Sequence, residues 1–212
     1  MLEYRLAPTH AHTSQINDVL AALALLASPT LLEAEGGVQR WARTSLLLIG
    51  HSAGAFMGLS VVLKPATGTR ALFVVDPVVR KAVAGLVLVD GIYDLPDLLA
   101  EYPDYSGFVE DAFGKDPSAL EADSPARWGF ATPDEGGRAM RMLVLHSNED
   151  ELLSLRQPEG LVARLGALEG GEAVLEVDYE TLKGSHDDVV KRDELAGAVK
   201  GWLQGGGNVK AP

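Results

Sequence analysis

The sequence contains no cysteine. Disulfide bonds, thiolate zinc sites, iron–sulfur clusters and a cysteine nucleophile are therefore all excluded. Its most apolar run, Val19 to Ala27, is well short of the ~20 residues that a membrane-spanning helix needs. The N-terminal residues also lack the basic and apolar pattern of a secretory signal. We therefore expect a cytoplasmic location and no membrane partner.

Basic residues are scarce as well, with 18 Lys and Arg against 30 Asp and Glu and a net charge of −12. A surface of this charge repels phosphate backbones, so we expect no nucleic-acid partner. Neither G-x-x-x-x-G-K-[ST] nor G-x-G-x-x-G occurs, so no phosphate-binding loop is predicted. His10 and His12 have no carboxylate cluster beside them, which makes them polar surface groups rather than metal ligands. No metal site is expected.

The 212 residues fit a single domain, 1–212, with a buried core. Apolar runs alternate with amphipathic stretches, a pattern typical of an α/β fold with a mostly parallel sheet and helices on both faces. Strands are predicted at Ser45–Ile49, Gly85–Val89 and Met142–Leu145, with weaker patterns at Leu2–Leu6 and Ala173–Tyr179. Helices are predicted at Ser14–Leu26, Ala53–Leu63, Leu155–Leu168 and Asp188–Leu203.

Some segments interrupt this alternation. Residues 28–44 and 64–84 contain proline and glycine and are interpreted as surface insertions. Residues 94–128 are richer in aromatic residues and proline and lie between two core strands. Because long excursions of this kind are often lids or binding loops, we predict a lid-like excursion here. The glycine-rich end, residues 204–212, is predicted to be a flexible tail.

The most informative motif is Gly50-His51-Ser52-Ala53-Gly54, a G-x-S-x-G directly after a predicted strand and before a predicted helix. A tight turn in this context strains the central serine and pushes its oxygen above the sheet, so small residues are needed two positions away. Gly50 and Gly54 meet that need. The N–H of Ala53 then points to where an oxyanion would form. The motif favours Ser52 as a nucleophile over a buried serine in a glycine-rich connection.

A serine nucleophile needs a base and an acid that orients the base, here expected in the chain order Ser, acid, His. Three carboxylates, Glu149, Asp150 and Glu151, follow the end of a predicted strand, the edge at which α/β sites are built. Asp150 is our candidate, its neighbours compete with it, and a solvated charged loop is the alternative. Of the five histidines only His186 follows it, so His186 is the candidate base rather than a surface histidine.

These motifs give the chain a family resemblance. It resembles the α/β-hydrolases, and among them kynurenine formamidase (arylformamidase) of the fungal type. The matching segments are residues 3–8 (EYRLAP), 50–55 (GHSAGA), 91–95 (GIYDL), 102–103 (YP), 112–114 (AFG), 145–157 (LHSNEDELLSLRQ) and 182–188 (LKGSHDD). The first two are shared with esterases of the hormone-sensitive-lipase type, whereas GIYDL and DELLSLRQ are narrower and favour the formamidase.

The resemblance implies hydrolysis of N-formyl-L-kynurenine to L-kynurenine and formate, a cytosolic step of tryptophan breakdown that feeds NAD synthesis. It implies no cofactor, a small aryl formamide as substrate, and it leaves room for a homodimer. Ser52, Asp150 and His186 would be the triad. The aromatic residues after Asp94 would cover the aryl substrate, or they are ordinary core residues.

The chain departs from the family at one point. Members carry an H-G-G-x-W oxyanion motif upstream of the YRLAP segment, and this sequence has no such residues. Loss of one oxyanion donor costs ~10²–10³ in rate. The strand before that motif lies beside the elbow strand, so we expect an unpaired ladder there or a new pairing. The alternatives to an impaired formamidase are a general carboxylesterase and a non-catalytic α/β-hydrolase-like fragment.

Overall fold

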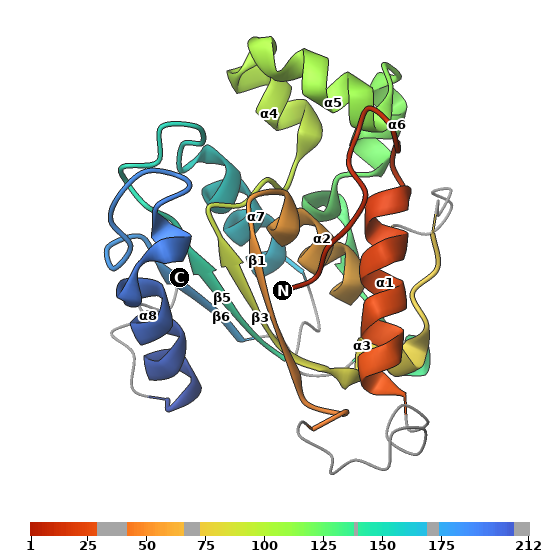
Figure 1. Ribbon diagram of the computed structural model, residues 1–212, viewed down its shortest axis with the longest axis vertical. Helices are drawn as coiled ribbons and strands as arrows, with labels where there is room; N and C mark the ends of the chain where they lie inside the picture. Colours follow the sequence, from red (N-terminus) through yellow and green to blue (C-terminus); the bar gives the residue numbers. More distant parts are fainter. Residues whose placement is uncertain (29–41, 66–72, 138–139, 169–173, 206–212) are drawn as a thin grey trace.

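The computed structural model describes residues 1–28, 42–65, 73–137, 140–168 and 174–205. In these residues a parallel four-stranded sheet forms the centre, in the order β1-β3-β5-β6. Helices flank it, and a group of shorter helices lies beyond one end of its strands (Figure 1). Among the described residues, no helix combines the length and the apolar character needed to cross a membrane.

All neighbouring strands of the sheet run parallel. They are β1 (Leu46–His51), β3 (Val83–Val89), β5 (Arg141–Leu145) and β6 (Val174–Asp178). In register, Leu48 pairs with Leu86, Leu86 with Met142, and Met142 with Leu175. Because the strands are parallel, all four end at the same edge of the sheet, and the loops that follow them meet there.

Alternating residues of the central strands pack on opposite faces of the sheet. Leu86 and Leu88 belong to a core formed with α1 (Ser14–Ala27), α2 (Ala53–Val62), α3 (Pro77–Ala82) and α7 (Arg156–Gly166). Val87 and Val89 pack instead against Trp202 of α8 (Asp193–Leu203) on the other face. Burial on both faces explains why these strands are continuous apolar runs.

The predicted excursion forms a helical cap, made of α4 (Leu95–Glu101), α5 (Ser106–Phe113) and α6 (Pro117–Ala122). Leu98, Val109 and Leu120 of the cap form an apolar cluster together with Phe56 of α2 and Leu153, so the cap packs on the rest of the fold. The carboxylate of Asp94 accepts the N–H of Asp97 at the start of α4 and pairs with Arg127 at 2.7 Å, which ties the two ends of the cap together. The lid-like behaviour of this segment stays a prediction.

Short elements complete the described fold. A small antiparallel pair joins β2 (Leu63–Lys64) to β4 (Gly129–Phe130). The 3-10 turns are η1 (Pro103–Tyr105), η2 (Pro125–Arg127), η3 (Pro133–Glu135) and η4 (Val189–Lys191).

The α/β architecture and the strands at β1, β3, β5 and β6 are confirmed, but the strand predicted at Leu2–Leu6 is wrong. A strand needs a neighbour to pair its N–H and C=O groups. Among the described residues no strand lies beside this segment, and Arg5 instead binds Asp18 of α1 through its backbone N–H and its guanidinium. As expected, the outer edge of β1 has no partner strand there, and Ile49 is 52% exposed.

Two other predictions need correction. Within residues 64–84, α3 is not a surface insertion, since Val79 is buried in the core. Asp76 caps this helix, because its carboxylate accepts a hydrogen bond from the N–H of Val78 at 2.7 Å. Asp followed by Pro is a typical signal for a helix start.

The helix predicted at Asp188–Leu203 is broken at Arg192, whose backbone is extended. Asp193 and Glu194 favour a new helix N-terminus there. Parts of the predicted insertions (residues 29–41 and 66–72), the start of the predicted last strand (residue 173) and most of the predicted tail (residues 206–212) lie outside the described residues.

Replacing Leu88 by Ala should lower the free energy of unfolding by about 2–5 kcal/mol, since its fully buried side chain would leave a cavity. Leu203→Ala is the matched control, because that side chain is 57% exposed, and its effect should stay within about 0.5 kcal/mol. Urea unfolding followed by circular dichroism measures both. Equal effects of the two substitutions would contradict the described packing.

Candidate active site

Ser52 lies in the sharp turn between β1 and α2, at the sheet edge where the parallel strands end. Its backbone has φ 54° and ψ −121°, a region that residues with a side chain rarely adopt. The turn is held by the N–H of Ser52, which donates to the carbonyl of Val89, and by its carbonyl, which accepts from Ile92. The strained turn expected of a nucleophile elbow is therefore present.

Gly50 fits this turn for a steric reason. A Cβ at this position would lie 2.3 Å from the carbonyl oxygen of Gly54 and 2.7 Å from the Cα of Ala55. Any side chain would force the strand and helix apart. The same requirement expected at Gly54 does not hold among the described residues, because a Cβ there would meet no atom within 4 Å.

Ala53 is the first residue of α2. Its N–H therefore has no acceptor within the helix, and the partial positive charge of the helix N-terminus adds to it. The role of this N–H as an oxyanion donor stays a prediction.

Asp150 and His186 come together from two different loops. Asp150 lies between β5 and α7, and His186 lies between β6 and η4. The Nδ1 atom of His186 is 2.7 Å from Oδ2 of Asp150, so Nδ1–H donates to the carboxylate. Glu149 is exposed, and Glu151 accepts only the backbone N–H of His186, so Asp150 alone of the three carboxylates bonds to the ring.

The pair shifts the titration of both groups. Burial lowers the pKa of His186, but the hydrogen bond and charge of Asp150 outweigh it and leave the pKa above its ordinary value. Burial raises the pKa of Asp150, yet the bonds from His186 and from the N–H groups of Leu153 and Leu152 leave it below its ordinary value. The carboxylate is therefore ionised and fixed in orientation.

His51, the residue before the serine, links the elbow to His186. Its Nε2 atom donates to the carbonyl of His186 at 2.9 Å, and the two rings lie 4.5 Å apart between centroids. Within the described part of the chain, no hydrogen bond joins Ser52 Oγ to the His186 ring. Bonds of this kind often tighten only when substrate binds.

Two buried residues beside the pair were missed from the sequence. Asp90 follows β3 and accepts the N–H of Ser147 at 2.8 Å, and the Nδ1 atom of His146 lies 3.4 Å from its carboxylate. Burial raises the pKa of Asp90 to about 6. Its position at the carboxyl end of a parallel strand was the available signal.

Asp90 also belongs to two clusters of side chains that could hold a cation. The ligand atoms of His51, Asp90 and His186 lie within 4.8 Å of one another, as do those of Asp90, His146 and Asp150. Both groups include a member of the Asp150–His186 pair. A cation bound there would compete with the hydrogen bond between them.

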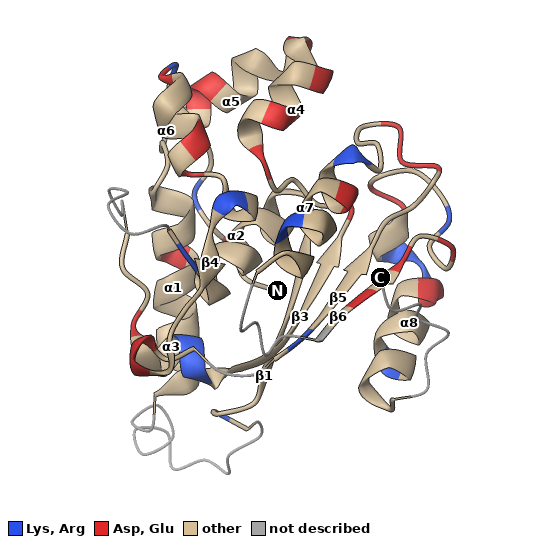
Figure 2. Ribbon diagram, turned by 180° about the vertical axis from the view of Figure 1, so that it is seen from behind, with Lys and Arg blue, Asp and Glu red and all other residues tan. Residues whose placement is uncertain are grey.

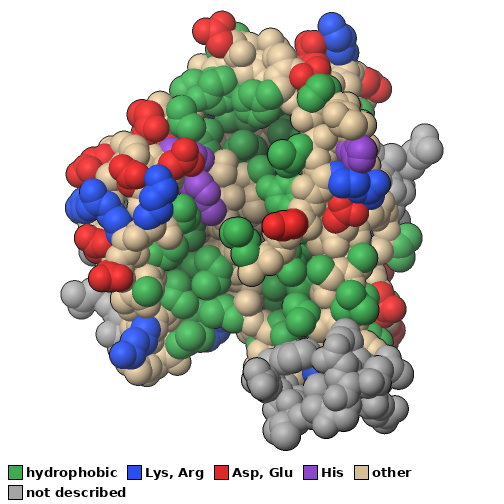
Figure 3. Space-filling model, viewed as in Figure 1, with side chains coloured by type: hydrophobic (Ala, Val, Ile, Leu, Met, Phe, Trp, Pro, Cys, Tyr) green, Lys and Arg blue, Asp and Glu red, His purple; other side chains and the backbone are tan. Residues whose placement is uncertain are grey.

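An apolar pocket of about 300 Å³ opens beside the elbow. Ala53 and Ile92 form its side next to Ser52, and the cap and the N-terminal segment form the rest. The residues that line it are Tyr4, Leu6, Ala7, His12, Gln15, Ala53, Phe56, Met57, Ile92, Leu95, Phe108, Val109, Ala112 and Phe113. Figure 3 shows hydrophobic side chains around this hollow below α4 and α5, with histidine at its edge.

The pocket explains what the N-terminal segment and the cap do. Tyr4 and Leu6, from the segment Leu2–Leu6 that was predicted to be a strand, instead form one wall together with Ala7, and the aromatic residues of α5 form another. The N–H of His12 donates to the carbonyl of Ala112 at 2.7 Å, which joins the two walls. None of the lining residues is acidic. Asp and Glu occur instead along α4, α5 and α6 and in the loops near α7 (Figure 2).

The comparisons place the chain in a known class. A family model described as alpha/beta hydrolase fold matches residues 1–163. The chain belongs to this family of α/β-hydrolases.

Within it, the chain is related to fungal kynurenine formamidases. It is 32% identical over 203 residues to the kynurenine formamidase of Meyerozyma guilliermondii, which covers 92% of this chain and 68% of that protein. It is 32% identical over 206 residues to that of Eremothecium gossypii, covering 94% of this chain and 76% of the relative. With that of Saccharomyces cerevisiae the identity is 27%, covering 92% and 70%.

Solved structures support the fold. A structure described as a truncated form of carbohydrate esterase from gut microbiota matches with a TM-score of 0.65 at 15% identity, covering 95% of this chain and 71% of that one. The thermophilic esterase Est2 of Thermogutta terrifontis matches with a TM-score of 0.54 at 15% identity, covering 93% and 67%. At this identity the likeness shows the architecture alone.

Gly50→Ala should destabilise the protein, because its Cβ would overlap the backbone of α2. A loss of about 1–3 kcal/mol or more in the free energy of unfolding is expected. Gly54→Ala is the control, since that Cβ meets open space within a helix, and stability should stay unchanged or rise by up to about 1 kcal/mol. Thermal unfolding compares them, and a Gly54→Ala loss as large as that of Gly50→Ala would refute this account of the turn.

Proposed function

We propose that the protein is a serine hydrolase that cleaves aryl formamides, with N-formyl-L-kynurenine as substrate and L-kynurenine and formate as products. The observation that carries the proposal is the bond between His186 and Asp150 beside a strained Ser52 elbow. The relatives named kynurenine formamidases support the choice of substrate. The cytoplasmic location, the homodimer and the lack of a cofactor stay predictions.

In this proposal Ser52 Oγ attacks the formyl carbon while His186 accepts its proton. The negatively charged oxygen of the tetrahedral intermediate accepts a hydrogen bond from the backbone N–H of Ala53. The intermediate then collapses as His186 returns the proton to the departing aryl nitrogen, leaving a formyl ester on Ser52. Water attacks this ester by the same route and releases formate.

Asp150 acts in this scheme through His186. Its bond to Nδ1 holds the ring so that Nε2 is the free base, and its charge stabilises the imidazolium formed during each step. The two N–H groups of Leu152 and Leu153 hold the other carboxylate oxygen at 2.8 and 3.0 Å, so the acid does not turn away.

The open apolar pocket favours a second candidate, a general carboxylesterase. Apolar walls accept many acyl and alcohol groups, whereas a formamidase should discriminate strongly in favour of its aryl formamide. Rates on N-formyl-L-kynurenine and on short p-nitrophenyl esters separate the two. A kcat/KM at least tenfold higher on the ester would favour the esterase.

A fluorophosphonate probe should label the wild-type chain and fail to label Ser52→Ala, because only an activated serine attacks the phosphorus. Hydrolysis of N-formyl-L-kynurenine should fall by at least about 10³-fold in the same variant. Ser118→Ala, at an exposed serine of α6, is the control and should keep both signals. Absence of labelling on folded wild-type protein would support a non-catalytic α/β-hydrolase-like chain instead.

The rate should depend on the protonation of His186. Because only the neutral ring accepts a proton, kcat/KM should rise with pH through an apparent pKa above the ordinary imidazole value of 6.5. Asp150→Asn should lower kcat by about 10⁴-fold with the fold retained, whereas Glu149→Gln should have little effect. A flat profile between pH 5 and 8, or a larger loss in Glu149→Gln, would overturn these assignments.

A further inference from the structure

The pocket beside Ser52 carries no charged side chain among its lining residues at neutral pH. None of the fourteen is Lys, Arg, Asp or Glu. The histidine among them is neutral, because burial lowers the pKa of His12 to about 4. A charged group placed in this pocket would lose its hydration without gaining an ionic partner. The pocket therefore suits an uncharged, largely apolar group.

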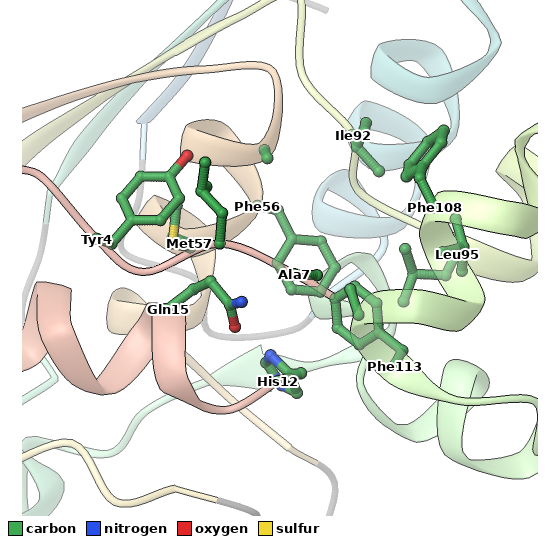
Figure 4. Close-up of a pocket in the computed structure, with 14 residues that line it drawn as sticks. Tyr4, Ala7, His12, Gln15, Phe56, Met57, Ile92, Leu95, Phe108 and Phe113 are labelled. Carbon is green, nitrogen blue, oxygen red and sulfur yellow. The ribbon is translucent and has the colours of Figure 1, made fainter. Parts of the chain in front are cut away.

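Two polar atoms in this apolar lining have no hydrogen-bond partner among the described residues. They are Nε2 of His12 and Oε1 of Gln15, and both are buried. Buried polar atoms are nearly always paired, so an unpaired one calls for a specific explanation. Here both atoms belong to residues that line the same pocket. Figure 4 shows His12 and Gln15 on the side of the pocket opposite Phe108 and Leu95.

The orientation of Gln15 makes its free atom an acceptor. Its Nε2–H donates to the carbonyl of His10 at 2.6 Å, which leaves Oε1 as the oxygen without a partner. An amide oxygen accepts hydrogen bonds and donates none, so its missing partner is an N–H or an O–H group.

The ring of His12 is held in place by aromatic neighbours. It lies 4.5 Å from the ring of Phe113 and meets Phe56 edge-on at 6.4 Å, while its backbone N–H is bound to Ala112. The neutral ring offers Nε2 as either a donor or an acceptor, depending on the tautomer. Both polar atoms are thus presented by fixed side chains, as in a built binding site.

We propose that His12 and Gln15 form a polar subsite for a neutral hydroxyl or amino group on the ring of a substituted aryl formamide, a group that N-formyl-L-kynurenine itself lacks. Such a group donates to Gln15 Oε1, and a hydroxyl also accepts from His12 Nε2. The faces of Phe56 and Phe113 provide the apolar contact for the ring. The inference rests on the proposed function for the aromatic nature of the substrate. It also places any charged end of that substrate outside the pocket.

The test measures binding to Ser52→Ala, so that it does not depend on turnover. Acetophenone is compared with its three ring-hydroxylated derivatives and with the anion 4-acetylbenzoate by saturation-transfer NMR titration. At least one hydroxylated ligand should bind about 3- to 10-fold more tightly than acetophenone, the range expected for one added hydrogen bond. The anion should bind more weakly than acetophenone. Absence of a hydroxyl advantage, or tighter binding of the anion, would overturn the proposal.

Substitutions locate the effect. In His12→Phe and Gln15→Leu the hydroxyl advantage should fall to less than twofold, with acetophenone binding retained. Asn17→Leu, on the exposed side of α1, the helix that contains Gln15, should leave the hydroxyl advantage intact. An advantage that persists in both pocket variants would contradict the subsite. If one variant does not fold, the other and the ligand comparison still decide. Failure of the fluorophosphonate test would leave this binding result readable, so the two proposals fail separately.

Discussion

The turn at Ser52 is the constraint on which the site depends. Its positive φ is tolerated because the surrounding contacts fix the chain on both sides. Gly50 has no side chain, so β1 can approach α2 closely. The backbone groups of Val89 and Ile92 hydrogen-bond to the backbone of the serine itself. Strain of this kind persists only when neighbouring structure over-determines it. The same turn also starts α2, so the serine oxygen and the N–H of Ala53 are positioned by one local event.

The parallel sheet then collects the other groups. Asp90, Asp150 and His186 each follow a different strand, and all three lie at the edge where the strands end. The bond from His186 to Asp150 connects the loops after β5 and β6, and the N–H of Ser147 connects the loop after β5 to Asp90. The bond from His51 to the carbonyl of His186 connects β1 to the loop after β6. Beyond them, the cap and the N-terminal segment form an uncharged pocket. The polar groups around Ser52 therefore lie next to an apolar cavity.

Much of this was predictable because it depends on local pattern. Continuous apolar runs marked the buried strands, and G-x-S-x-G between a strand and a helix marked the elbow at Ser52. The order along the chain singled out His186, but it left Glu149 and Glu151 as competitors of Asp150 until the structure showed which carboxylate bonds to the ring. Other features depend on partners that the sequence does not display. Leu2–Leu6 reads as a strand but has no neighbouring strand to pair with, and His12 looks like a surface residue until α5 packs over it. Asp90 and His146 became visible only as neighbours in space.

The most direct test of the central claim is to trap the covalent intermediate. Wild-type protein mixed with N-formyl-L-kynurenine, quenched in acid within the first turnover and digested, should show a formyl adduct by mass spectrometry on the peptide that contains Ser52. Asp150→Asn should form it more slowly, and Ser52→Ala should show none. Turnover of the substrate by Ser52→Ala at the wild-type rate, or a formyl adduct at a different residue, would contradict the account.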